Sequence, residues 1–75
     1  MSMNIHVVAV KGKFRAEFPC LQTPTAITRQ IADSPDRIEA YRQWAEGRNK
    51  PHAKEFSRWV ESALSEGLTI EVYAT

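Results

Sequence analysis

Apolar and polar residues alternate along the first part of the chain in the way typical of β-strands. Residues 4–10 are rich in β-branched side chains, and residues 13–18 alternate between apolar and charged positions. Lys11-Gly12 lies between these two runs, and a two-residue connection of this kind predicts a β-hairpin. This turn implies a register with one apolar face, in which Ile5 pairs with Phe18, Val7 with Ala16 and Ala9 with Phe14.

The pattern then changes to helical spacing. Thr23 before Pro24 fits a helix start, because threonine can cap a helix and proline is tolerated in its first turn. Ile27 and Ile31, four residues apart, give this helix an apolar side. A second start signal predicts another helix over residues 35 to about 46.

Two glycines are expected to end helices, because glycine readily adopts the left-handed conformation that follows a last helical turn. Gly47 is the predicted end of the second helix, and Gly67 is that of a third helix over residues 49 to about 66. Residues 68–73 then alternate between apolar and polar positions, which predicts a third strand.

These elements predict an α+β fold in one domain over residues 1–75. In the order ββαααβ, they are expected to form a small three-stranded antiparallel sheet with the helices packed on one face. The last strand is expected to pair with the first, so that the first strand lies in the middle. A chain of 75 residues also has a thin core, since domains of this size bury only about 60% of their unfolded surface.

The composition is that of ordinary globular proteins, with 43% hydrophobic residues, 25% charged residues and a formal net charge of +1. No apolar run in the sequence approaches the roughly 20 residues that span a bilayer, and the start of the chain lacks the pattern of a secretory signal. The single cysteine, Cys20, cannot form an internal disulfide. We therefore expect a cytoplasmic protein without a membrane partner.

Side chains typical of enzymes are sparse, so no catalytic residue, metal site or cofactor is predicted. Cys20 has apolar neighbours in the sequence, and a buried, unreactive thiol is its expected state. His6 is expected to face Glu17 across the hairpin, and such polar pairs are common on exposed strand faces. His6, Cys20 and His52 have no recognised metal-ligand spacing, and the glycines stand singly at turns.

Two tryptophans flank the basic segment of residues 48–54. Trp44 and Trp59 each lie one step off the apolar stripe of a predicted helix, so we expect them to widen the core. Anchoring of a partner and stacking on nucleic-acid bases are the alternatives.

Residues 26–64 resemble a ribbon–helix–helix DNA-binding unit. In this resemblance, residues 26–31 are the ribbon, Ser34-Pro35-Asp36 starts the first helix, residues 47–49 form the turn, and residues 55–64 belong to the second helix. The resemblance implies a dimer that reads the major groove of DNA. The reading residues would be Thr28 and Gln30, or Ile27, Arg29 and Ile31 in the other register.

The second face of the predicted sheet is the most informative surface feature. Val8 and Val10 point away from the side expected to carry the helices, and exposed apolar groups rimmed by charge often mark an interaction surface. Basic residues also gather at the turn between the second and third helices. Together they predict a partner-binding surface made of Val8, Val10, Lys13, Arg15, Arg48, Lys50, Lys54 and Tyr73.

We therefore expect a small non-enzymatic protein-binding module that inhibits or regulates a larger cytoplasmic protein or nucleoprotein complex. Small proteins of phages and mobile elements are of this kind. The partner would present an acidic or nucleic-acid-binding surface, and direct nucleic-acid binding is the weaker expectation because the net charge is near zero. A homodimer through the open sheet face or a free strand edge is a further expectation.

Overall fold

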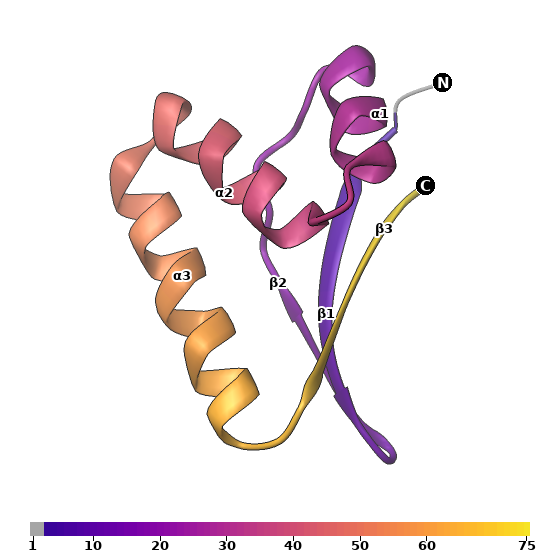
Figure 1. The fold of residues 1–75 in the computed structure, drawn as a ribbon, viewed down its shortest axis with the longest axis vertical. Coiled ribbons are helices and arrows are strands. Elements are labelled where there is room, and N and C mark those ends of the chain that lie inside the picture. Colours follow the sequence, from indigo (N-terminus) through magenta and orange to yellow (C-terminus); the bar gives the residue numbers. More distant parts are fainter. Residues whose placement is uncertain (1–2) are drawn as a thin grey trace.

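The computed structural model describes residues 3–75 and has three helices and a three-stranded sheet there (Figure 1). Both outer strands pair antiparallel with β1, which gives the strand order β2-β1-β3. The predicted α+β class, element order and strand order are confirmed. The elements are β1 (Ile5–Lys11), β2 (Phe14–Phe18), α1 (Thr25–Asp33), α2 (Arg37–Arg48), α3 (Lys50–Ser65) and β3 (Thr69–Ala74).

All three helices lie on the same side of the sheet, and α2 and α3 form a helical hairpin (Figure 1). The two ends of the described chain meet at the sheet, where the backbones of Asn4 and Thr75 exchange hydrogen bonds of 2.9 and 3.1 Å. The first residue of α2 also reaches the sheet, because Arg37 Nη1 donates to the Val72 carbonyl on β3 at 2.9 Å. The opposite face of the sheet carries no helix of the described chain.

The hairpin turn differs from the prediction by one residue. Lys11 pairs with Phe14, so the turn is Gly12-Lys13, and the register is Val7 to Phe18 and Ala9 to Ala16. Gly12 has φ +60°, whereas no non-glycine residue described has a positive φ, and a glycine first in a two-residue turn is typical of type II′. The predicted turn would have placed Lys11 in that position, where a Cβ is disfavoured. Each β2 residue therefore pairs two residues further along β1 than predicted, and because side chains alternate with a period of two, each keeps its predicted face.

Asn49, rather than Gly47, separates α2 from α3. Gly47 is helical with an ordinary φ, and α2 continues to Arg48. The backbone of Asn49 is extended (φ −155°, ψ 94°), and its side-chain oxygen accepts a hydrogen bond from the backbone N–H of His52 at 3.3 Å. Asn49 therefore caps α3, which satisfies one of the free donors at the helix start.

The start of α2 and the end of α3 are capped close to where the sequence predicts these helix ends, whereas the start of α1 is not. Asp36 caps α2 by accepting from the backbone N–H of Glu39 at 3.0 Å. The predicted cap at Thr23 does not form, and its hydroxyl bonds instead to the hydroxyl of buried Thr28. Gly67 has φ +80° and follows α3, with hydrogen bonds from Gly67 N to Leu64 O and from Leu68 N to Ala63 O. That pair of bonds is a Schellman motif, so the predicted end at Gly67 is confirmed.

The core lies between the helices and the sheet and is centred on aromatic rings. Val7, Tyr41 and Phe56 have no exposed surface. The Phe56 ring meets those of Phe18 and Tyr41 edge to face, with ring centroids 5.2 and 4.9 Å apart. The predicted packing role of the tryptophans is confirmed, since both are half-buried against this core.

Tyr41 carries the main polar group inside the core. Its hydroxyl accepts a hydrogen bond from the backbone N–H of Leu21 at 2.8 Å and lies 2.8 Å from Nε2 of His52. Because the Leu21 N–H can only donate, the hydroxyl proton is free to be donated to His52. Burial raises the pKa of the Tyr41 hydroxyl well above its ordinary value. This residue ties the segment after β2 to the start of α3.

Tyr41→Phe is expected to lower the free energy of unfolding by about 1–3 kcal/mol, because it leaves the Leu21 N–H without its partner. Since the folded state raises the pKa of Tyr41, wild-type stability should also fall as the pH rises above about 10, where the unfolded tyrosine ionises. Tyr41→Phe should lack that part of the alkaline loss. Urea unfolding at neutral and alkaline pH measures both effects, with Tyr73→Phe as the control. Equal stability of Tyr41→Phe and wild type would contradict the assignment.

Candidate functional site

The open sheet face does not carry the exposed apolar patch that the sequence predicted. Val8 is only 1% exposed, and Val10 is half-buried. Val8 lies on the central strand with Glu17 and Glu71 directly opposite it on the two outer strands. A central position flanked by long side chains loses its contact with water even without a covering helix. The prediction of Val8 as an accessible contact residue is therefore wrong.

His6 and its neighbours form a closed polar cluster on the same face. His6 Nδ1 lies 2.7 Å from a Glu17 carboxylate oxygen and must carry a proton to donate to it. His6 Nε2 lies 2.7 Å from the Thr75 hydroxyl, and the ring stacks on Tyr73 with centroids 5.0 Å apart. The predicted pair of His6 and Glu17 forms, although in this register Glu17 is the diagonal neighbour. Tyr73, a predicted contact residue, is half-buried by this stacking.

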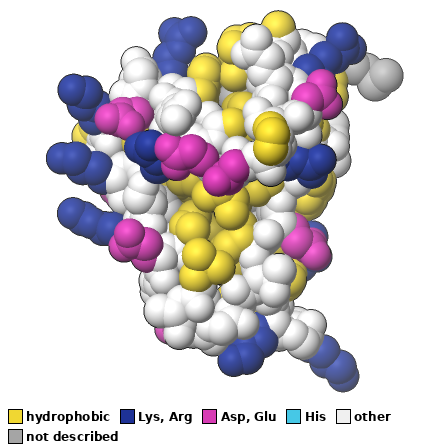
Figure 2. Space-filling model, in the orientation of Figure 1, with side chains coloured by type: hydrophobic (Ala, Val, Ile, Leu, Met, Phe, Trp, Pro, Cys, Tyr) yellow, Lys and Arg dark blue, Asp and Glu magenta, His cyan; other side chains and the backbone are white. Residues whose placement is uncertain are grey.

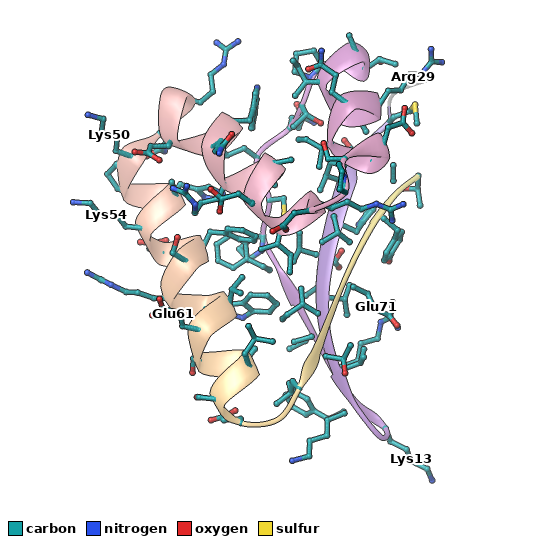
Figure 3. The ribbon with its side chains drawn as sticks, in the orientation of Figure 1. Lys13, Arg29, Lys50, Lys54, Glu61 and Glu71 are labelled. Atoms are coloured by element: carbon teal, nitrogen blue, oxygen red, sulfur yellow. The ribbon has the colours of Figure 1, made fainter. Side chains whose placement is uncertain are left out.

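The predicted surface splits into two parts that do not meet. Lys13 and Arg15 are exposed on the hairpin, whereas Lys50 and Lys54 are exposed at the start of α3. Figure 3 shows Lys13 at one end of the molecule and the two α3 lysines near the other. The helices lie on one side of the sheet, so the open face and the basic turn point in different directions. The prediction that these residues form one combined surface is therefore wrong.

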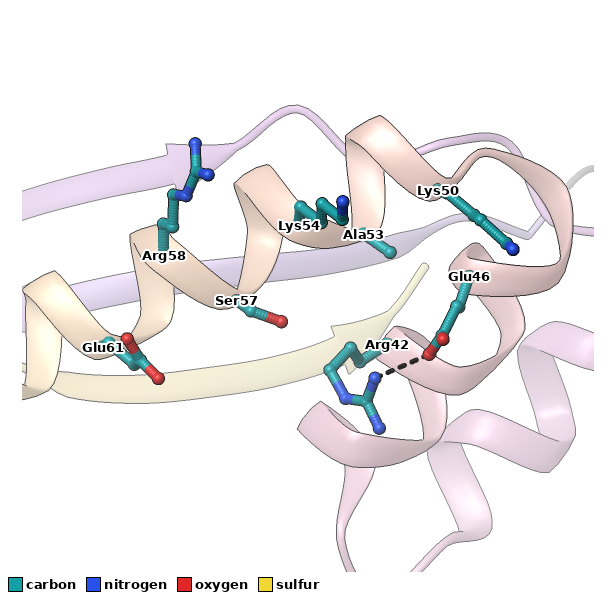
Figure 4. Close-up of a pocket in the computed structure, with 8 residues that line it drawn as sticks. All are labelled: Arg42, Glu46, Lys50, Ala53, Lys54, Ser57, Arg58 and Glu61. Carbon is teal, nitrogen blue, oxygen red and sulfur yellow. Dashed lines mark hydrogen bonds and ion pairs between the residues drawn. The ribbon is translucent and has the colours of Figure 1, made fainter.

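A groove runs between α2 and α3 beside the basic turn (Figure 4). Its volume is about 500 Å³. Arg42 and Glu46 face it from α2, and Ser57 and Glu61 point toward them from α3 (Figure 4). Ala53 and Ser57, one helical turn apart, form the floor of the groove, and their small side chains leave space above the α3 backbone. The lining residues are Arg42, Glu46, Lys50, Ala53, Lys54, Ser57, Arg58 and Glu61.

Charge along this groove is unevenly compensated. Arg42 is held by Glu39 and by Glu46, the latter at 2.8 Å, and these carboxylates raise the pKa of its guanidinium. In residues 3–75, by contrast, Lys50, Lys54 and Arg58 take part in no ion pair. These three form the α3 basic row, with a helical rise of about 6 Å between successive members. Their charges are available to an external anion.

The α3 basic row continues outward from the groove. Lys50 begins it at the helix start, and Arg58 points away from α2 onto the outer face of α3 (Figure 4). The sequence identified Lys50 and Lys54 but missed Arg58, although the four-residue spacing was a readable signal. Arg48, the third predicted basic residue, instead lies over the Trp44 ring, 6.0 Å from its centroid.

The groove is continuous with a more apolar hollow. A second depression of about 370 Å³ shares Arg42, Ser57 and Glu61 with the first. Its other lining includes Ile38, Phe56 and Val60. Figure 2 shows this apolar area on the face where α2, α3 and β3 come together. Leu64, on the next turn of α3, is 55% exposed. Ile38 is half-buried in the hollow, whereas Phe56 and Val60 are buried, so the unpaired positive charge lies beside a small apolar depression.

The ribbon predicted from the ribbon–helix–helix resemblance is a helix. Residues 25–33 form α1, and Thr28, one of the predicted base-reading residues, has no exposed surface. Gln30 and Arg29 are exposed, but on a helix rather than on a strand. The strand that the resemblance implied is therefore wrong, and the helix predicted from the four-residue spacing of Ile27 and Ile31 is confirmed.

The remaining chemical candidates stay separate from this groove. Cys20 is half-buried beside the core, and burial raises the pKa of its thiol. The described residues hold no cluster of three or more side chains that could ligate a metal. Among the helices of residues 3–75, none has the length and apolar character needed to cross a membrane.

Comparison of the chain with known protein families, with curated proteins and with solved structures found no match. The functional argument therefore rests on the residues of this chain alone. The strongest feature is the joint surface of the α3 basic row and the groove between α2 and α3.

Proposed function

We propose that this protein is a small non-enzymatic binding module that regulates or inhibits a larger protein by engaging an acidic surface on it. The contact surface is the α3 basic row together with the groove between α2 and α3. The observation that carries the proposal is the set of three unpaired cations beside a groove that leads into apolar side chains.

The charge pattern supports a protein partner over a nucleic acid. Glu46 and Glu61 line the same groove as the lysines, so the positive charge is confined to one side of it, which suits a local acidic patch better than a continuous phosphate backbone. The neighbouring apolar hollow offers a hydrophobic contact that a phosphate backbone would not use. Protein interfaces commonly combine an apolar centre with a charged rim, and the charges raise the association rate and select the partner.

Reversal of two charges in the α3 basic row tests the proposal. The double variant Lys50→Glu/Lys54→Glu is expected to weaken partner binding by roughly tenfold or more, because attraction to an acidic surface becomes repulsion. Both residues are exposed, so the thermal melt should change little. The partner is captured from nuclease-treated lysate with the wild-type protein, identified, purified and titrated against each variant by calorimetry.

The control is Lys13→Glu, which reverses an exposed charge at the hairpin turn, far from the α3 basic row (Figure 3). It should bind as wild type does apart from a small change in long-range attraction. Equal weakening by the control and the double variant would refute the proposed surface. Loss of capture after nuclease treatment would show that nucleic acid, rather than protein, was the bound molecule.

A further inference from the structure

We infer that the partner presents an amphipathic α-helix with an acidic flank, and that this helix lies in the groove between α2 and α3. This inference rests on the proposed function and specifies the shape and chemistry of the bound element. A third helix packed there would complete a three-helix arrangement with the α2–α3 hairpin. Grooves of this type bind helices through apolar residues spaced three and four positions apart.

The floor of the groove permits the close approach of a helix. Ala53 is 4% exposed and Ser57 is half-buried, and neither side chain extends far above the α3 backbone. Large side chains at these positions would hold a partner helix away. From Lys50 to Glu61 the groove follows about 16 Å of α3, which corresponds to roughly three turns of a bound helix.

The two ends of the surface call for different side chains on the bound helix. Lys50 and Lys54, unpaired in the described structure, favour Asp or Glu on the flank nearest the start of α3. Ile38 and Val60, in the adjoining hollow, favour a large aliphatic or aromatic side chain at the other end. Both preferences are met by one amphipathic helix, whereas an extended acidic tail would meet only the first.

Synthetic peptides test the inference without knowledge of the natural partner. The probe is a helix-forming peptide of about 14 residues with leucines on one face and glutamates along one flank, a length that covers the groove. The comparison peptide has the same composition with its leucines spread around the helix. A single-stranded oligonucleotide of similar charge is the third probe. Binding is measured by fluorescence anisotropy and by NMR chemical shifts of the ¹⁵N-labelled protein.

The amphipathic peptide is expected to bind at least about tenfold more tightly than the other two probes, with the largest shifts at Ala53, Ser57 and Val60. Ser57→Phe should weaken its binding by a similar factor, because the ring fills the floor of the groove. Ser62→Phe is the matched control, since Ser62 is exposed on α3 and does not line the groove. It should leave binding unchanged. Chemical-shift mapping on the wild-type protein keeps the test decisive if Ser57→Phe fails to fold.

Equal binding of the two peptides, tighter binding of the oligonucleotide, or no effect of a folded Ser57→Phe would overturn the inference. These outcomes differ from failure of the proposed function, which concerns the captured partner. A partner that is lost with Lys50→Glu/Lys54→Glu but retained with Ser57→Phe would show that the α3 basic row binds protein without a helix in the groove.

Discussion

Phe56→Ala is expected to lower the free energy of unfolding by about 3–5 kcal/mol, which approaches the whole stability of a domain of this size. Phe56 has no exposed surface and lies on the buried side of α3. Its ring contacts those of Phe18 on β2 and Tyr41 on α2, so it joins three elements. Truncation would remove apolar burial and leave a cavity at the centre of the core. Urea unfolding followed by tryptophan fluorescence measures the loss.

Two further variants make this result interpretable. Phe56→Leu keeps most of the volume and should cost less than about 1.5 kcal/mol, so it remains measurable if the alanine variant is unfolded. Phe14→Ala removes the same group from a side chain that is 58% exposed, and it should change stability by less than about 0.5 kcal/mol. Similar losses for Phe56→Ala and Phe14→Ala would refute the assignment of Phe56 to the core centre.

The fold could be predicted from local patterns because most of its elements carry strong ones. Alternation defined the hairpin and the last strand, and Asn49 with Pro51 marked the start of α3. The errors arose where two local signals competed. Gly47 has the residue type of a helix end, but the cap formed by Asn49 determines where α2 stops. At the hairpin, the sequence predicts Gly12 as the second turn residue, whereas the glycine takes the first place, where the backbone has a positive φ.

The candidate site was less predictable because it depends on tertiary geometry. Lys50 and Lys54 could be found as a basic cluster, since they are neighbours in sequence and on one helix. The groove beside them depends on the angle between α2 and α3, which places Arg42 opposite Ser57. No spacing within a single helix contains that information.

Tertiary geometry also limits what the sequence predicts for the open sheet face, but there it buries a residue that the sequence pattern marks as exposed. Alternation correctly placed Val8 on the face without helices, but it could not show how the outer strands cover that position. Val8 is buried on the central strand, where residues 17 and 71 of the two outer strands lie directly opposite it, and this three-strand pairing is not visible in the alternation of one strand. The burial of Val8 therefore removes the basis for a homodimer through the open sheet face, whereas pairing of two copies through the free edge of β2 or β3 stays a prediction.

Val8→Asp is expected to destabilise the protein by about 3–5 kcal/mol at neutral pH, because it places a short charged side chain at a position that is only 1% exposed. A longer lysine could extend its charge to water, whereas aspartate cannot. Glu17 and Glu71 lie directly opposite and add like-charge repulsion from both outer strands. Urea unfolding at neutral pH, compared with the wild type, measures the loss.

The pH dependence and a neighbouring variant separate this explanation from simple loss of packing. Burial and the two glutamates should raise the pKa of the introduced aspartate in the folded state above its ordinary value of about 4. The ionisation part of its penalty is therefore full only above the raised folded-state pKa, and it shrinks as the pH falls from there toward about 4. Val10→Asp is the control, because Val10 is half-buried and pairs with Arg15 rather than with a carboxylate. It should cost distinctly less. If Val8 were exposed as its alternation suggests, both variants would cost less than about 0.5 kcal/mol at any pH. That outcome would restore the open sheet face as a contact surface.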